Sequence, residues 1–124
     1  MLRDRERDRR SSPQTVKDPV DTRERPLVCT ACGHRITDED YRIEMAGSHE
    51  HTFVNPAGFV HHIGCWAVAP GCVHVGLTES AFSWFPVWKW QLAACGSCRA
   101  HLGWIYRNAG EQFHGLITTA IRQA

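Results

Sequence analysis

Short runs in which apolar and polar residues alternate dominate the chain from residue 26 onward. Such alternation is typical of half-buried β-strands, because successive side chains of a strand point to opposite faces. Two of these runs, residues 52–54 and 59–63, flank the turn-forming stretch 55–58, Asn-Pro-Ala-Gly. This arrangement predicts a β-hairpin.

Further strands are predicted wherever the same pattern, or a short apolar run bounded by Gly or Pro, recurs. They are residues 27–34 (a strand entering a tight turn), 41–45, 65–69 (continuing the hairpin), 72–77, 87–94, 102–106 and 113–117, the last strand of the chain. No segment shows a sustained apolar stripe with helical spacing. We therefore expect a mainly β fold.

Aromatic residues concentrate in two of these strands and in the stretch before them. Four of the five tryptophans, together with a tyrosine, fall within residues 81–106. Alternation places three large side chains of each strand on one face: Trp88, Trp90 and Leu92 in the first, and Leu102, Trp104 and Tyr106 in the second. Aromatic side chains bury large areas, so such a cluster forms either a core or the wall of a pocket. We interpret it as partly a pocket wall, with Trp66 and Trp88 in the core or at the rim.

Charge divides the chain into two parts. Residues 1–25 hold 8 of the 14 Lys and Arg and 6 of the 13 Asp and Glu, with almost nothing to bury. This composition predicts a disordered charged tail over 1–25 and one globular domain over 26–124. The domain is nearly neutral, which argues against a nucleic-acid-binding surface. Neither an apolar signal segment nor a membrane-spanning run is visible, so we expect a cytoplasmic protein without nucleic-acid or membrane partners.

Two Cys-x-x-Cys pairs indicate a metal site. Cys29 and Cys32 form the first pair, and Cys95 and Cys98 form the second. Four thiolates suit a tetrahedral Zn²⁺, and a site with four protein ligands is structural because no position stays open for a substrate. Gly33, just after the first pair, suits the positive φ that such turns demand. We expect one structural zinc per chain, joining distant parts of the sequence.

The remaining cysteines, Cys65 and Cys72, have three histidines nearby, His61, His62 and His74. These residues lack the regular spacing of a second metal site. Free cysteine is among the most buried residue types, so we interpret Cys65 and Cys72 as core residues.

The motifs taken together resemble one known family. In chain order they are Cys29-x-x-Cys32, Asn55-Pro56-x-Gly58, Ser83-Trp84-Phe85-Pro86-x-x-x-Trp90, Cys95-x-x-Cys98, His101-Leu102-Gly103-Trp104-x-Tyr106 and Phe113-x-Gly115-Leu116. With these spacings, residues 27–120 resemble the CULT domain, the thalidomide-binding domain of cereblon. The small single-domain bacterial members of the family look most similar.

The resemblance implies both a fold and a ligand. The fold is a pair of antiparallel β-sheets that meet at an angle and are pinned by a four-cysteine zinc site, known as a β-tent. The ligands are cyclic imides, such as the glutarimide ring of thalidomide or a cyclic imide at the C-terminus of a peptide, and possible further ligands are uracil-like rings. The large region that docks cereblon to a ubiquitin-ligase adaptor is not recognisable in this sequence, so no such adaptor is expected as a partner.

The resemblance also assigns residues to the pocket. Trp84, Trp90 and Trp104 are expected as the walls of an aromatic cage, which Tyr106 closes where the human protein has Phe. Backbone groups at Phe82 and Trp84 are expected to hydrogen-bond the imide. The complete expected set of ligand-binding residues is Asn55, Pro56, Phe82, Ser83, Trp84, Trp90, Trp104 and Tyr106. The human protein has a ligand-bonding His at the position of Phe82, so this side-chain contact is lost here.

Other functions remain open from the residues alone. An aromatic cage can hold a methylated ammonium through cation–π attraction, although only Glu79 lies near it in sequence. A zinc-bearing methionine sulfoxide reductase has similarly paired cysteines, and Cys65 or Cys72 would then have to supply a reactive thiolate. A zinc-ribbon nucleic-acid binder would need a basic stripe. Because no nucleophile and base are paired, a binding protein rather than an enzyme is the preferred interpretation.

Overall fold

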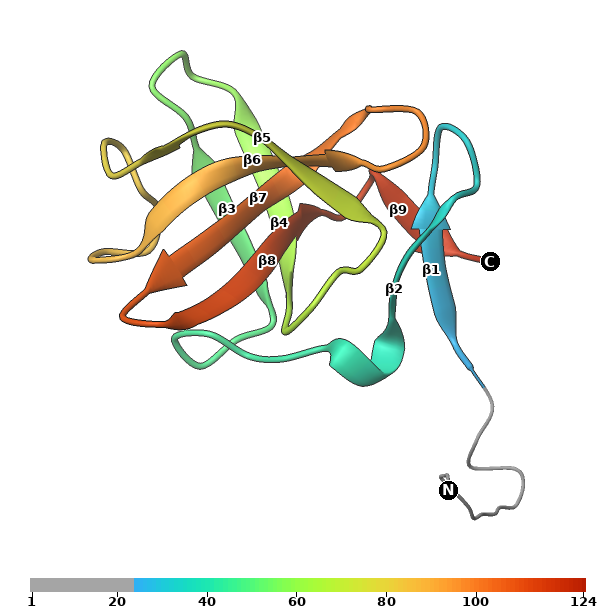
Figure 1. Ribbon diagram of the computed structural model, residues 1–124. Coiled ribbons are helices and arrows are strands. Elements are labelled where there is room, and N and C mark those ends of the chain that lie inside the picture. The colour runs from blue at the N-terminus through green and yellow to red at the C-terminus, as the bar shows by residue number, and fades with distance from the viewer. Residues whose placement is uncertain (1–23) are drawn as a thin grey trace.

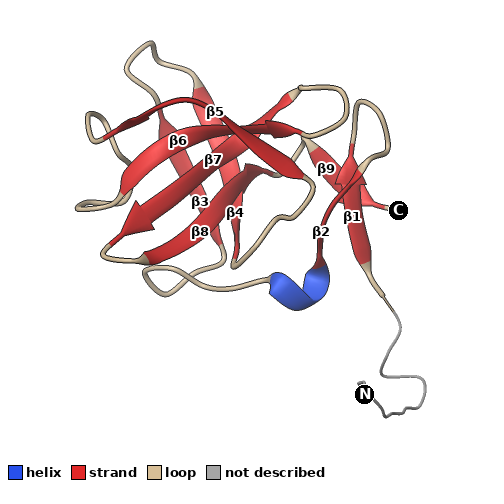
Figure 2. Ribbon diagram, viewed as in Figure 1, coloured by secondary structure: helices blue, strands red, loops and turns tan. Residues whose placement is uncertain are grey.

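The computed structural model describes residues 24–124, which form two antiparallel β-sheets (Figures 1 and 2). The small sheet has the order β2-β1-β9, with β1 at Pro26–Cys29, β2 at Arg35–Asp38 and β9 at Ile121–Gln123. The large sheet has the order β3-β4-β8-β7-β6-β5. Its strands are β3 (Glu50–Val54), β4 (Val60–Trp66), β5 (Cys72–Glu79), β6 (Lys89–Cys95), β7 (His101–Asn108) and β8 (Glu111–Ile117). The predicted fold class is confirmed.

The hairpin predicted around residues 55–58 is β3–β4. Its strands pair from Glu50 with Gly64 to Val54 with Val60. The turn closes because the Asn55 N–H donates to Phe59 O at 2.9 Å and the Gly58 N–H donates to Asn55 O at 2.9 Å. The predicted strands at 72–77, 87–94, 102–106 and 113–117 are present as β5, β6, β7 and β8. The segment 27–34 gives β1 and the turn after it, and the continuation of the hairpin predicted at 65–69 ends at Trp66.

The strand predicted at residues 41–45 is wrong. A short 3₁₀ helix, Glu39–Tyr41, takes its place, and beyond it Arg42 and Met45 make only isolated bridges, to Trp66 and Ser48. The helix begins because the Asp38 carboxylate accepts the N–H of Asp40 at 3.0 Å, which is the bonding of a helix N-cap. The local cap therefore overrides the alternation of apolar residues that follows it.

The small sheet contains two strands that the sequence did not predict, β2 and β9. β1 lies between them, with Leu27 paired to Thr37 on one side and to Gln123 on the other. β9 also means that the strand predicted at 113–117 is not the last one. The three-residue β9 exists only through its pairing with β1, so it has no local pattern by which it could be recognised.

Two predicted strand faces are partly wrong. Trp88 lies before β6, after a Val87 with φ +67°, and so it does not share the face of Trp90 and Leu92. In β7 a bulge opposite Ala93 and Ala94 breaks the alternation, because these neighbours pair with Gly103 and His101. Leu102 is the extra residue of this bulge, and it is buried away from Trp104 and Tyr106 in a different core cluster.

The core has two parts. One joins the sheets and contains residues from both, namely Leu27, Cys29, Ile36, Trp66, Ala69, Cys95, Leu102, Leu116 and Ile121. The other lies on the opposite face of the large sheet and contains Ile63, Cys65, Phe85, Trp104, Tyr106 and Phe113. The second core is mostly aromatic, and it is the base on which the candidate pocket is built.

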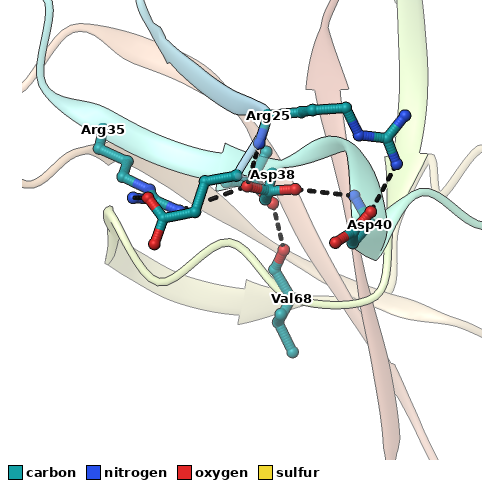
Figure 3. A network of polar contacts seen from close by, with 7 residues as sticks. Arg25, Arg35, Asp38, Asp40 and Val68 are labelled. Atoms are coloured by element: carbon teal, nitrogen blue, oxygen red, sulfur yellow. Dashed lines mark hydrogen bonds and ion pairs between the residues drawn. The ribbon is translucent and has the colours of Figure 1, made fainter. Parts of the chain in front are cut away.

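A polar network holds the start of β1 against β2 and the 3₁₀ helix (Figure 3). Asp38 is buried, and its carboxylate accepts the N–H groups of Asp40 and Arg25, each at 3.0 Å. These bonds lower the pKa of Asp38, against the effect of burial. Thr37 donates to Val68 O at 2.7 Å and so ties β2 to the loop that follows β4.

The predicted disordered tail falls almost entirely on residues 1–23, which lie outside the described residues. Glu24 makes an ion pair with Arg35. Among the described residues, no helix is long and apolar enough to cross a membrane.

Candidate functional site

The four cysteines of the two Cys-x-x-Cys pairs come together between the sheets. Cys29 ends β1 of the small sheet and Cys95 ends β6 of the large sheet. The four sulfur atoms all lie within 4.8 Å of one another, and the cysteines are not in disulfides. Two Sγ–Sγ distances are 3.7 Å, from Cys29 to Cys98, and 3.6 Å, from Cys32 to Cys95.

This geometry could hold a metal ion. A tetrahedral ion with Zn–S bonds of about 2.3 Å would place its sulfur ligands about 3.8 Å apart, close to the two shortest distances here. Cys95 Sγ also accepts the N–H groups of Ser97 at 3.4 Å and Cys98 at 3.5 Å. Burial opposes the charged thiolate, but these two N–H bonds and the neighbouring thiols lower the pKa of Cys95. The donor set therefore fits a structural metal.

Cys65 and Cys72 stand apart from this cluster. Cys65 is fully buried in the aromatic core, and burial raises the pKa of its thiol to about 12. Cys72 is half-buried beside the core that joins the sheets, and burial likewise raises its pKa to about 12. Neither thiol can supply a thiolate near neutral pH, in keeping with the prediction that both are core residues.

A cavity of about 640 Å³ opens on the aromatic face of the large sheet. Residues of the β3–β4 hairpin, of the loop between β5 and β6, and of strands β6 and β7 surround it. It is lined by Asn55, Pro56, Phe59, Val60, His61, Phe82, Trp84, Trp90, Leu92, His101, Trp104 and Tyr106. The structure thus brings together seven of the eight residues expected to bind a ligand, all except Ser83.

Three tryptophans form walls of the cavity. The rings of Trp84 and Trp104 meet edge to face, with centroids 4.9 Å apart at 76°. Trp90 is the cross-strand neighbour of Tyr106, and its indole N–H donates to Ala81 O at 2.7 Å. This bond fixes the Trp90 ring against the loop before β6. Trp88 instead packs edge to face on Phe113, with centroids 5.0 Å apart, outside the lining.

Ser83 and Asn55 shape the loops at the cavity. The Ser83 hydroxyl donates to Phe85 O at 3.0 Å and does not line the cavity. The Asn55 side-chain oxygen accepts the N–H groups of Ala57 at 3.0 Å and Phe59 at 2.9 Å, so it stabilises the hairpin turn as well as facing the cavity.

Sequence reasoning missed several lining residues, of which two are histidines. His61 contacts the rings of Trp84 and Trp104, with centroid distances of 5.6 Å and 5.4 Å. His101 packs edge to face on Trp104 at 5.0 Å. Strand alternation after the hairpin turn places His61 on the same side as Phe59, so the hairpin pattern contained the signal for it.

The protonation state of His101 follows from its contacts. Burial lowers its pKa, and His61 acts in the same direction. The neutral ring must donate from Nε2, because its neighbour there, Gly103 O at 3.0 Å, can only accept. Its Nδ1 atom then carries the lone pair. His101 is therefore both a structural hydrogen-bonding residue and part of the cavity wall.

Comparison with known proteins supports the resemblance that the motifs indicated. No protein-family model matches the chain. The chain is 36% identical to cereblon of Danio rerio over 52 residues, which is 42% of this chain and 12% of that protein. It is 32% identical to cereblon of Xenopus tropicalis over 75 residues, or 56% of this chain and 17% of that protein. Cereblon of Drosophila pseudoobscura pseudoobscura is 27% identical over 77 residues, which is 56% of this chain and 12% of that protein.

The similarity to these relatives covers only a small part of their length. The matched segment spans less than a fifth of the length of these relatives. Within that segment the sequence is similar to cereblon, and residues 24–124 have the two antiparallel sheets and the four-cysteine cluster that the motifs predicted. The sequence matches, the two antiparallel sheets and the four-cysteine cluster are consistent with a cereblon-like CULT domain.

Proposed function

We propose that this domain is a binding module for small cyclic imides, which it holds in the tryptophan-walled cavity. The observation that carries the proposal is the composition of the lining, in which Trp84, Trp90, Trp104 and Tyr106 surround the cavity and no carboxylate of residues 24–124 takes part. A planar, uncharged ring fits against indole faces, which offer a large apolar area with defined geometry.

The polar edge of an imide needs partners, because burying it unpaired costs a few kcal/mol. An imide presents an N–H donor between two carbonyl acceptors. In the described part of the chain, Phe82 O and the Trp84 N–H take part in no backbone hydrogen bond of the loop that contains them. They are therefore available as the acceptor and donor for an imide edge. Phe82 adopts φ +60°, a conformation that ordinary residues seldom adopt.

The chemistry of the lining separates this proposal from a methylated-ammonium cage. A cationic ligand is best held where a carboxylate assists the aromatic faces. Glu79, the nearest acidic residue in sequence, does not line the cavity. No carboxylate of residues 24–124 therefore assists a cation at the tryptophan faces, so a neutral ring is the better ligand.

We further propose that the domain is a binder without catalytic activity and that its metal is one structural Zn²⁺. Four thiolates close the coordination sphere and leave no position for a substrate. The reductase alternative needs an exposed thiol with a low pKa, whereas Cys65 is buried and the pKa of its thiol is raised to about 12. A free ring or a ring at a peptide C-terminus would be the partner, and no ligase adaptor, nucleic acid or membrane is required.

The proposal is tested by titrating the protein with glutarimide while tryptophan fluorescence is recorded. Saturable quenching is expected for the wild type, and Trp84→Ala should abolish it because one wall of the cavity is removed. Trp88→Phe is the matched control, since Trp88 packs on Phe113 outside the lining. Absence of binding by the folded wild type up to millimolar glutarimide would refute the proposal.

A further inference from the structure

Trp84 lies in the loop between β5 and β6, where no strand fixes the direction of its ring. No backbone hydrogen bond of residues 24–124 involves Trp84. Trp90, another wall of the cavity, belongs to β6, and its indole N–H is held by Ala81 O. The side chains that pack on Trp84 must therefore set its orientation.

Phe53 covers one face of the Trp84 ring. The two rings stack, with centroids 4.9 Å apart and an angle of 11° between their planes. Phe53 lies on β3 and does not line the cavity, whereas Trp84 does. Because an aromatic ring has two faces, Trp84 has only the face away from Phe53 to offer to a stacked ligand.

Phe53 is itself held by its neighbours. It packs edge to face on Phe85, a buried residue of the aromatic core, with centroids 5.4 Å apart. His51, two positions earlier on the same face of β3, has its ring parallel to that of Phe53, at 5.6 Å and 3°. His51 is anchored in turn, because its Nε2 donates to Met45 O at 2.9 Å. Close packing on several sides leaves Phe53 little freedom to change rotamer, so it is a firm support for Trp84.

The partner of Phe53 on the next strand also contacts Trp84. Phe53 is the cross-strand neighbour of His61 in the β3–β4 hairpin. The His61 ring lies 5.6 Å from that of Trp84. Directly opposed side chains of antiparallel strands stand next to each other on one face of the sheet. The hairpin thus touches Trp84 with two adjacent side chains, of which His61 lines the cavity and Phe53 stands outside the lining.

We propose that Phe53 is a positioning residue, which does not touch the ligand but holds the Trp84 ring in the orientation that binds it. This inference rests on the proposed binding of cyclic imides and adds to it a residue behind the cavity wall. A wall that is already fixed loses little freedom when a ligand binds, whereas a wall that can turn must be ordered by the ligand at a cost in affinity. Leucine at position 53 would fill part of the same volume but would offer no flat surface to the indole.

The role of Phe53 is tested with the dissociation constant of glutarimide for the zinc-loaded wild type, Phe53→Leu and Phe53→Tyr. We expect binding to weaken about tenfold in Phe53→Leu. Phe53→Tyr keeps the aromatic ring, so its affinity should stay within about twofold of the wild type. Ile117→Ala is the control for a general loss of packing, because Ile117 packs on the same aromatic core without lining the cavity. Its affinity should equal that of the wild type.

A second measurement follows the Trp84 ring without any ligand. Fluorine NMR of protein labelled with fluorotryptophan gives a signal for Trp84, which is identified by its loss in Trp84→Phe. This signal should move and broaden in Phe53→Leu but not in Phe53→Tyr or Ile117→Ala. The signal of Trp88, which packs on Phe113 outside the cavity, should stay unchanged in all variants and so shows that they are folded.

The outcomes separate the role of Phe53 from the proposed function. If the wild type binds glutarimide and folded Phe53→Leu binds it equally tightly, the positioning role is refuted while the proposed function stands. An unchanged Trp84 signal in Phe53→Leu also refutes the role, whatever the affinities. If the wild type does not bind glutarimide but the Trp84 signal responds as expected, the proposed function is refuted and the hold of Phe53 on Trp84 is supported.

Discussion

Gly33 and Arg99 occupy the same position in the two Cys-x-x-Cys turns, one residue after the second cysteine of each. Both have left-handed backbones, with φ +81° and +68°. Gly33 donates its N–H to Cys29 O at 2.8 Å, and Arg99 donates to Cys95 O at 2.9 Å. Glycine adopts this conformation without steric cost, whereas arginine does not. The second turn therefore contains strain that the first avoids.

This relationship predicts opposite effects of two substitutions. Arg99→Gly should raise the free energy of unfolding by roughly 0.5–1 kcal/mol, because relief of the left-handed strain exceeds the entropy that glycine adds to the unfolded chain. Gly33→Ala should lower it by roughly 1 kcal/mol. Urea denaturation of the zinc-loaded protein measures both. Arg42→Gly is the control, since φ at Arg42 is −64° and glycine there can only destabilise. Equal losses for Arg99→Gly and Arg42→Gly would contradict the argument.

Removal of the metal should unfold much of the domain. Structural zinc contributes on the order of 10–16 kcal/mol to small domains, which is comparable to or larger than their typical total stability of about 5–15 kcal/mol. The cluster joins β1 to β6, so both sheets depend on it. Metal analysis should give one zinc per chain, and Cys32→Ser should lose it together with the native circular dichroism spectrum. Cys72→Ala is the control and should keep one zinc. Two zincs in the wild type would show that a site outside the cluster has been overlooked.

The parts of this structure that depend on short-range spacing could be predicted from the sequence. Each Cys-x-x-Cys pair, the positive φ of Gly33 and the turn at Asn55 are defined by neighbouring residues, and all are present. The placement of Trp88 and Leu102 could not be predicted. A left-handed Val87 redirects the first, and a bulge between β6 and β7 redirects the second. The first depends on one backbone dihedral before β6 and the second on how β6 aligns with β7, and alternation within one segment reveals neither.

The residues of the cavity also divide into those that sequence motifs predict and those that only the tertiary structure reveals. Trp90 and Tyr106 lie on neighbouring strands with the spacing that their motifs indicate, and they are cross-strand partners. His61 enters the site from β4, which does not pair with β6 or β7, so only the assembly of the large sheet, with β4 paired to β8, brings it to Trp84 and Trp104. Motifs identified the walls of the cavity, whereas tertiary structure was needed to find the residues that complete it.

Gly103 should tolerate no side chain. A Cβ atom there would lie 2.1 Å from Gly115 O and 2.9 Å from Leu116 Cα, both in the backbone of β8. Gly103→Ala should therefore push β7 from β8 and destabilise the domain by roughly 2–4 kcal/mol. Because Trp104 follows directly, glutarimide binding should weaken as well. Gly110→Ala is the matched control: φ there is +86°, but a Cβ meets nothing within 4 Å, so only about 1 kcal/mol of backbone strain is expected. Equal losses of stability would show that the steric contact is relieved at little cost.

Buried His114, which contacts the exposed His74, should make stability fall on mild acidification. Their Nε2 atoms are 3.0 Å apart, and His114 is 3% exposed. Burial, followed by the charges of His74 and Arg107, lowers the pKa of His114 to about 4. In the unfolded chain a histidine titrates near 6.5, so between these values the unfolded state binds more protons. Stability is then lost as pH falls from about 6.5, and the loss at pH 5 should be roughly 2 kcal/mol.

The prediction is checked by measuring unfolding free energies at pH 7 and pH 5 for the wild type and His114→Phe. The variant lacks the titrating group, so its stability should change less between the two pH values, by roughly 2 kcal/mol. His62→Phe is the control, because His62 is exposed on β4 and bonds Thr52 at 2.9 Å, away from the pair. NMR titration of the His114 ring gives an independent readout. A midpoint near pH 6.5 in the native protein would mean that water reaches His114 and stabilises its charged form, and the difference between wild type and variant should then vanish.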